Sequence, residues 1–225
     1  PLMAARSLPW SWCVCGGMFD PGFLYASFTG GKTWADVAAL DPAQVELVNH
    51  GWSHQDVTDP ALLRHEVVES RERIIDETGR DVLGWMPAGV DYPEGLRWKT
   101  APLLRTSGAE ELYHRTTGGR LILGSHAWAT DTLQRPGDGG LITHPLDGSP
   151  RMLAARQWLD YAADAGVEVD GIGDEHVAAA VERGHGVILS LHATHIEGGM
   201  AGTNRMTLAG LTGFLDRLEA LRDAG

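Results

Sequence analysis

The sequence is short of basic residues and has no long hydrophobic run. It contains 18 Lys and Arg against 30 Asp and Glu, so its formal net charge is −12. This charge disfavours a polyanion such as nucleic acid as a partner, whereas a neutral or cationic ligand, for instance a sugar polymer, meets no such penalty. No run of 18 apolar residues occurs, and the sequence therefore predicts no membrane span.

Cysteine is equally scarce, with Cys13 and Cys15 as the two examples in the sequence. Two residues apart on one strand, they face the same side and are poorly placed to join in a disulfide. We predict reduced cysteines in the core, which leaves the redox compartment open.

The length of 225 residues and the hydrophobic content of 43% suit one globular domain. Apolar runs bounded by Gly and Pro predict strands at residues 10–14, 45–48, 81–86, 111–114, 121–123, 151–155 and 187–192. Helical spacing and capping signals predict helices at residues 2–6, 34–40, 60–78, 96–104, 157–165, 174–183 and 207–222. The second of these begins with Thr33 as the cap and Asp36 three residues on, the pattern of a capping box. Strands that alternate with helices predict a single α/β domain over residues 1–225, with a parallel sheet that is open or barrel-like.

The stretch that organises the rest is the strand at residues 45–48, which leads into His50 and His54. The two histidines lie where the strand gives way to a loop or to a first helical turn. On a helical turn, residues i and i+4 share a face, so both imidazoles can point at one ion. Hydrolytic zinc sites usually add a carboxylate and an open position. The alternative is a chance spacing in a chain with 10 His.

Functional groups in parallel α/β folds gather at the carboxyl ends of the strands. Several predicted strands end in such groups: Gly16-Gly17, His50 with His54, Pro87-x-Gly89, and His192. Their convergence favours a site at this edge of the sheet.

At these residues the sequence resembles the polysaccharide deacetylases (carbohydrate esterase family 4), which remove N-acetyl groups from chitin-like or peptidoglycan glycans. Residues 33–34 and 45–54 are similar to the second motif of the family and its approach. Residues 85–89 occupy the place of the third motif, and residues 187–192 are similar to the last. Order and spacing agree over nearly the whole chain.

The sequence also departs from the family pattern. Nothing matches the first motif, whose two aspartates supply a metal ligand and the general base. Trp85 stands where the third motif usually begins with Arg, and Gly51 stands where the second usually has Ser or Thr. The chain therefore resembles a catalytic domain that is cut at both ends.

The resemblance implies a distorted or incomplete (β/α) barrel with about seven parallel strands. It implies a hydrolase of carbon–nitrogen bonds other than peptide bonds, holding Zn²⁺ or another divalent ion such as Co²⁺, Ni²⁺ or Mn²⁺. His50 and His54 are the implied ligands, with Asp20 as a fallback third. A metal-bound water is the nucleophile, and His192 is the general acid that protonates the leaving amine.

The implied partner is an acetylated glycan, the chemistry being removal of N-acetyl or O-acetyl groups. Trp52, Pro87, Gly89 and Tyr92 are candidates to line the glycan groove, although a core Trp is an equal reading of Trp52. A cell-wall substrate would place the protein outside the cytoplasm, on a cell surface or on a phage virion. The oligomeric state is left open.

Two other functions stay open. One is a non-catalytic glycan-binding domain on the same scaffold, in a cell-wall or phage virion protein that lacks the first motif. The other is a hydrolase of a different small amide. An upstream strand ending in two adjacent Asp would favour the enzyme.

Overall fold

The computed structural model describes residues 2–54, 62, 64–86, 113–115, 121–123, 128–134, 144–145, 151–158, 177–186, 189–192, 196–197 and 206–224. The chain divides into two compact units. The central unit comprises Pro9–Thr132 and Ser149–Leu153, and the terminal unit comprises Pro1–Leu8, Leu133–Gly148 and Ala154–Gly225. The expectation that residues 1–225 form one domain stays a prediction.

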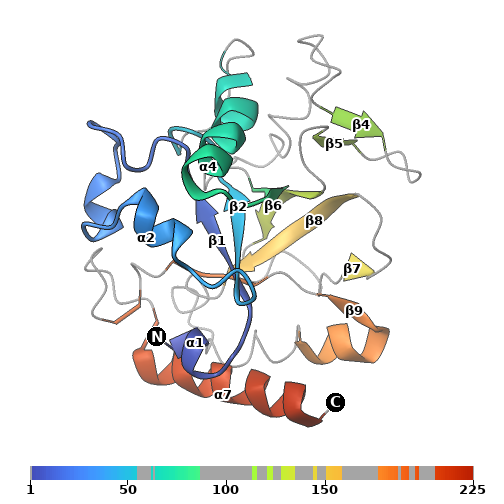
Figure 1. Cartoon of the computed structure of the whole chain (residues 1–225). Helices are drawn as coiled ribbons and strands as arrows, with labels where there is room; N and C mark the ends of the chain where they lie inside the picture. The colour runs from blue at the N-terminus through green and yellow to red at the C-terminus, as the bar shows by residue number, and fades with distance from the viewer. Residues whose placement is uncertain are drawn as a thin grey trace. The chain divides into compact units, whose positions relative to one another are not determined.

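The central unit is built on a parallel sheet with the strand order β1-β2-β3-β6 (Figure 1). These strands are β1 (Trp10–Val14), β2 (Val45–Asn49), β3 (Val82–Trp85) and β6 (Trp128–Gln134). A separate antiparallel pair joins β4 (Tyr113–Arg115) to β5 (Leu121–Leu123). The α/β class and the parallel sheet predicted from the sequence are thus confirmed. Strand β6 was not predicted, because its sequence WATDTLQ contains neither a continuous apolar run nor a regular alternation of apolar and polar residues.

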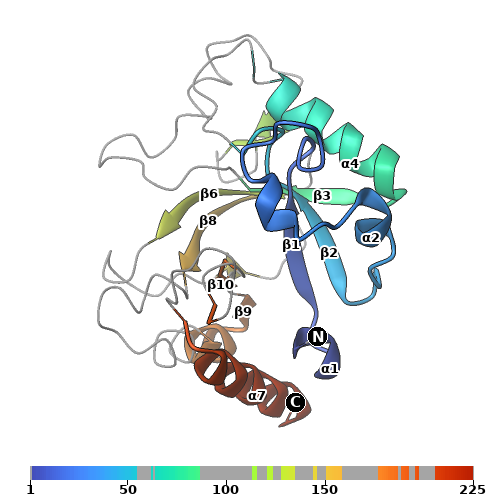
Figure 2. The ribbon, with the colours of Figure 1, turned by 90° about the vertical axis from the view of Figure 1, so that its left-hand side faces the viewer.

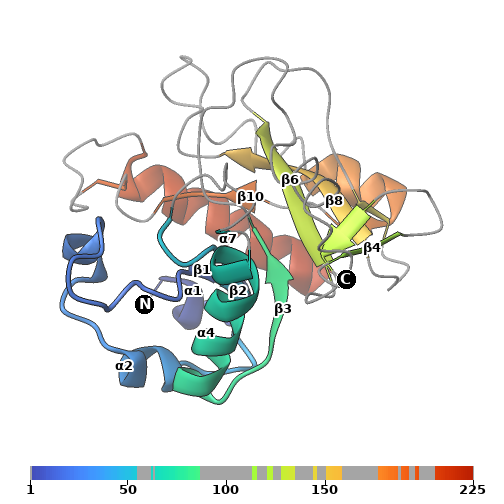
Figure 3. The ribbon, with the colours of Figure 1, turned by 90° about the horizontal axis from the view of Figure 1, so that it is seen from above.

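Short helices connect these strands. The 3-10 helix η1 (Ala26–Thr29) precedes α2 (Trp34–Ala38), and the π-helix η2 (His65–Glu69) continues into α4 (Ser70–Thr78). Thr33 and Asp36 form the expected capping box at the start of α2. Gly79 ends α4 in a left-handed conformation with φ of +66°. Figures 2 and 3 show α2 and α4 side by side, with α4 along β2 and β3.

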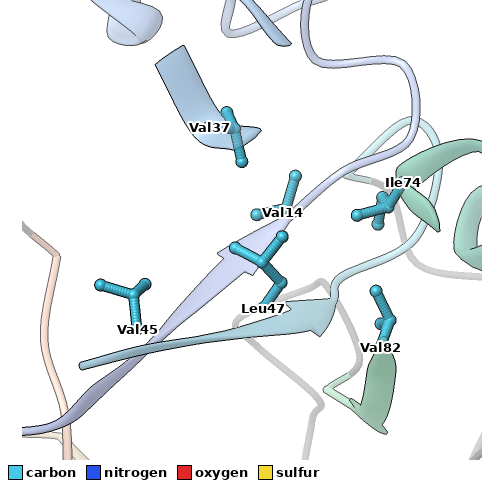
Figure 4. Packing of buried hydrophobic residues seen from close by; sticks show 6 residues of the cluster. All are labelled: Val14, Val37, Val45, Leu47, Ile74 and Val82. Carbon is cyan, nitrogen blue, oxygen red and sulfur yellow. The ribbon is translucent and has the colours of Figure 1, made fainter. Parts of the chain in front are cut away.

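The core of the central unit lies between the sheet and these two helices (Figure 4). Alternate residues of β1 and β2 face it, because side chains of a strand point to opposite faces in turn. Six buried residues make up this cluster: Val14, Val37, Val45, Leu47, Ile74 and Val82. Their packing holds the carboxyl ends of β1, β2 and β3 in place, and the candidate site lies at these ends.

The terminal unit contains the helices α1 (Leu2–Ala5) and α7 (Leu208–Ala224), and an antiparallel pair of β7 (His144–Pro145) with β9 (His185–Gly186). It also contains the paired residues of β8 (Arg151–Trp158) and β10 (Leu189–Ser190), which run parallel. The division between the units crosses two strands, since Leu133 and Gln134 of β6 belong to the terminal unit and residues 151–153 of β8 to the central one. Residues 177–183 are helical, within the predicted helix 174–183. The core of the terminal unit consists of Leu8, Met206, Leu211, Phe214 and Leu215.

One predicted helix needs correction, and another lies outside the described residues. The predicted helix 157–165 is wrong at its start, because Gln157 and Trp158 belong to β8 and pair with β10. Backbone pairing with a neighbouring strand overrides the local helical pattern there. The predicted helix 96–104 lies outside the described residues. Within the described part of the chain, no helix is long and apolar enough to cross a membrane.

Candidate metal-binding turn

His50 and His54 lie on the turn that follows β2, and their rings face each other. The ring centroids are 4.8 Å apart and the ring planes are inclined by 71°. The turn is not helical, since Gly51 has φ of +87° and His54 has φ of +57°. Of the two possibilities left open by the sequence, the loop is therefore the one observed. Histidine is one of the non-glycine residues that adopts this left-handed region most often.

The ring of His50 is oriented by the neighbouring strand end. Its Nδ1 lies 2.7 Å from the carbonyl oxygen of Met86, directly after β3. A carbonyl oxygen can only accept, so Nδ1 carries the proton and donates. In the neutral ring the lone pair then resides on Nε2. This is the arrangement that proteins use to orient a metal-ligating histidine.

The segment between the two histidines is held by Glu66 of the π-helix. Oε2 of Glu66 accepts hydrogen bonds from the backbone N–H groups of Trp52 (2.7 Å) and Ser53 (3.0 Å). Oε1 accepts from the hydroxyl of Ser53 at 2.6 Å. Glu66 is buried, with 6% of its surface exposed. Its negative charge is therefore compensated by hydrogen-bond donors of the turn.

A second set of buried polar contacts fixes the start of the turn. The side-chain amide of Asn49 donates to the Val67 carbonyl (2.8 Å), and its Oδ1 accepts from the backbone N–H of Gly51 (3.2 Å). The hydroxyl of Ser70 lies 2.8 Å from Asn49 Oδ1 and 2.7 Å from the Gly51 carbonyl oxygen. Asn49 and Ser70 have no exposed surface. Buried polar groups of this kind specify one backbone path.

Aromatic rings surround the histidine pair. Tyr25 makes an edge-to-face contact with His54 at 4.8 Å, and Trp52 packs on His65 at 4.4 Å. Trp52 also packs on Gly17, where an added Cβ would lie 2.6 Å from the indole nitrogen. Gly17, which follows β1, thus leaves room for the indole ring of Trp52 because it has no side chain. Contact of Trp52 with a glycan stays a prediction.

Sequence reasoning missed Glu66 and Tyr25. Neither carries a spacing signal relative to the histidines, since both reach the turn from elements distant in sequence.

The two imidazoles suit a borderline ion such as Zn²⁺ in kind, but they make up only part of a ligand set. Among the residues that the structure describes, no group of three His, Cys, Asp or Glu could hold a metal ion. The fallback ligand Asp20 is therefore not joined to the pair. Its carboxylate instead lies 3.9 Å from the guanidinium of Arg73.

The other predicted site residues lie in the terminal unit or outside the described residues. His192 is half-buried two residues after β10 and belongs to the terminal unit. Pro87, Gly89 and Tyr92 lie outside the described residues. Their roles stay predictions.

Both cysteines are reduced thiols, as the sequence predicted. Cys15 lies beneath the turn, with its Sγ 3.6 Å from the His50 carbonyl oxygen. Burial raises the pKa of the Cys15 thiol, and the nearby Cys13 and Glu66 add to the shift. The protonated thiol packs here as a small apolar group of the core.

Comparison with solved structures identifies the class of fold. The structure of a protein assigned as a polysaccharide deacetylase from Mycobacterium smegmatis matches with a TM-score of 0.58 and 15% identity, covering 99% of this chain and 69% of that one. The structure of Puue allantoinase matches with a TM-score of 0.55 and 18% identity, covering 97% of this chain and 64% of that one. No family model and no curated protein matches the sequence. The chain has the fold of the polysaccharide deacetylases, and it spans about two thirds of the length of these two proteins.

Proposed function

We propose that the protein is a metal-dependent hydrolase that removes acetyl groups from a glycan such as a chitooligosaccharide or peptidoglycan. The observation that carries the proposal is the facing pair His50 and His54, with Nδ1 of His50 committed to the Met86 carbonyl oxygen. The pair follows β2 at the carboxyl edge of a parallel sheet, where such folds hold their sites. The proposal includes a sheet of about seven strands that curves into an incomplete barrel.

The chemistry requires help for both reactants, because an amide is a poor electrophile and water is a poor nucleophile. A divalent ion such as Zn²⁺, when bound, polarises the carbonyl and acidifies water. In this proposal His50 and His54 hold the ion, and His192 gives a proton to the leaving amine. Trp52 and Tyr92 contact the sugar through their aromatic faces, which suit pyranose rings. Pro87 and Gly89 line the same groove.

Two alternatives each have one observation in their favour. A non-catalytic glycan-binding domain is favoured by the lack of a third ligand among the described residues. A hydrolase of another small amide is favoured by the similarity of fold to an allantoinase. An acetylated glycan as partner would agree with a location on a cell surface or on a phage virion.

Acetate release from acetylated chitooligomers distinguishes these functions. We expect release in the presence of Zn²⁺, its loss with a chelator and its return when Zn²⁺ is restored. Release that the chelator leaves untouched would reject the metal mechanism. Retained binding of the oligomer without release would favour the binding domain, and hydrolysis of allantoin instead of the oligomer would favour the small-amide enzyme.

A further inference from the structure

The π-helix η2 places a buried carboxylate against the segment that joins the two candidate ligands. The backbone N–H of Ser70 donates to the carbonyl oxygen of His65, five residues earlier, which is the hydrogen bond that defines this geometry. Single π-helical turns inside α-helices are frequent at functional sites. Here the turn carries Glu66, Val67 and Val68 into the interior.

We propose that Glu66 is a positioning residue for the histidine pair, an inference that rests on the proposed metal-dependent function. Its two oxygens accept three hydrogen bonds from Trp52 and Ser53, at 2.6–3.0 Å. All three donors lie between His50 and His54. The carboxylate therefore fixes the backbone between the two histidines and so holds the ring of His54 against that of His50.

The geometry of Gly51 ties the same carboxylate to the first half of the turn. A Cβ at Gly51 would lie 3.0 Å from Glu66 Oε2, and the φ of +87° is open to glycine. Glycine thus permits the close approach of the carboxylate. Glu66 acts through the backbone and Ser53, and it reaches the ion only through the residues that it orients.

The neighbouring Glu69 provides a matched control. It lies on the same π-helix, but its carboxylate pairs with the ring of His65 at 2.8 Å, and the side chain is 47% exposed. Glu66→Leu keeps a side chain of similar size but removes both acceptor oxygens, so the two N–H groups and the Ser53 hydroxyl lose their acceptor. Glu69→Leu makes the same chemical change at a carboxylate that pairs with His65.

The test uses the whole chain and two readouts. The first is NMR of the metal-free protein: the ¹H–¹⁵N side-chain spectrum reports the Nδ1–H tautomer of His50, and ¹H–¹H NOEs report the contact between the two rings. The second is binding of Co²⁺ by calorimetry. We expect Glu66→Leu to lose the ring contact and to bind Co²⁺ at least about tenfold more weakly, as for other residues that orient ligands. Glu69→Leu should retain both properties.

Each result decides the matter. If Glu66→Leu keeps the ring contact, the tautomer and the Co²⁺ affinity, the inference is wrong. If the ring contact depends on Glu66 but the unsubstituted protein binds no Co²⁺, the proposed metal chemistry fails while the positioning role stands. If Glu66→Leu does not fold, Ser53→Ala decides, because it removes the hydroxyl contact alone. A smaller change in the same direction supports the inference, and no change overturns it.

Discussion

The Nδ1 atom of His50 lies 2.7 Å from the carbonyl oxygen of Met86, which joins the carboxyl end of β2 to that of β3. The backbone N–H of Met86 donates in turn to the Asn49 carbonyl oxygen at 2.9 Å. The orientation of the first imidazole is therefore set by the pairing of two central strands. The orientation of the second depends on a turn with two left-handed residues, Gly51 and His54.

Removing either imidazole should abolish metal binding. We expect His50→Ala and His54→Ala to bind Zn²⁺ at least about a hundredfold more weakly, because each deletes one of few ligands. Glu69→Ala is the control, since Glu69 is exposed on η2 and its carboxylate pairs with His65. Calorimetric titration with Zn²⁺ measures the affinities. Equal affinities for all three variants would show that the pair does not hold the ion.

Gly51→Ala should destabilise the protein more than Gly79→Ala. Both positions have positive φ, +87° and +66°, so each substitution costs roughly 1–2 kcal/mol in backbone strain. A Cβ at Gly51 also meets Glu66 at 3.0 Å, whereas one at Gly79 meets nothing within 4 Å. Urea unfolding of both variants gives the difference, which isolates the contact with Glu66. A larger loss at Gly79 would contradict the described turn.

Leu47→Ala should lower the free energy of unfolding by about 2–5 kcal/mol, the range for deletion of a fully buried leucine. Leu47 is 1% exposed in the cluster between the sheet and the helices. Leu83 on the adjacent strand β3 is 49% exposed, and Leu83→Ala should change the free energy by about 0.5 kcal/mol or less. Chemical denaturation compares the two. Similar losses would mean that β2 does not face this core as described.

Stability should fall at alkaline pH, in part because of Cys15. Burial raises the pKa of this thiol in the folded protein, so the folded chain keeps its proton to higher pH than the unfolded chain. The contribution is complete below the unfolded value of about 8.5 and is lost above it, by at most about 1.4 kcal/mol per pH unit.

Urea unfolding of the protein and of Cys15→Ala between pH 7 and pH 10 measures this effect. The variant loses some packing at every pH, so the informative quantity is the slope against pH. We expect a shallower alkaline slope in Cys15→Ala. Identical slopes would show that the thiol is not protected by burial.

Local signals predicted the elements near the start of the chain. The apolar run of β1 and the capping box of Thr33 with Asp36 depend on neighbouring residues, and both are observed as expected. Strand β6 has no continuous apolar run, and its pairing with β3 comes from the tertiary structure. Gln157 likewise pairs with Leu189 as part of a strand, although its local sequence pattern predicted a helix.

The candidate site was predictable in part. The spacing of His50 and His54 after a strand identified the pair, but nothing local predicted that His54 would adopt φ of +57°. Glu66 and Tyr25 contact the turn from other elements, so their contribution depends on how the chain folds back. The general acid His192 and the groove residues Pro87, Gly89 and Tyr92 stay predictions.

The π-helical turn makes the length of the chain between Glu66 and Ser70 critical. Both residues contact the turn after β2, one at its middle and the other at its start. Deleting one residue between them would turn η2 into ordinary α-helix and would rotate Glu66 by about 100° around the axis relative to α4. The deletion would leave the hydrophobic packing of Ile74 in place while pointing the carboxylate elsewhere. Single-residue deletions in this segment should therefore be tolerated around Ile74 but should displace the histidine turn and the buried Val67 and Val68.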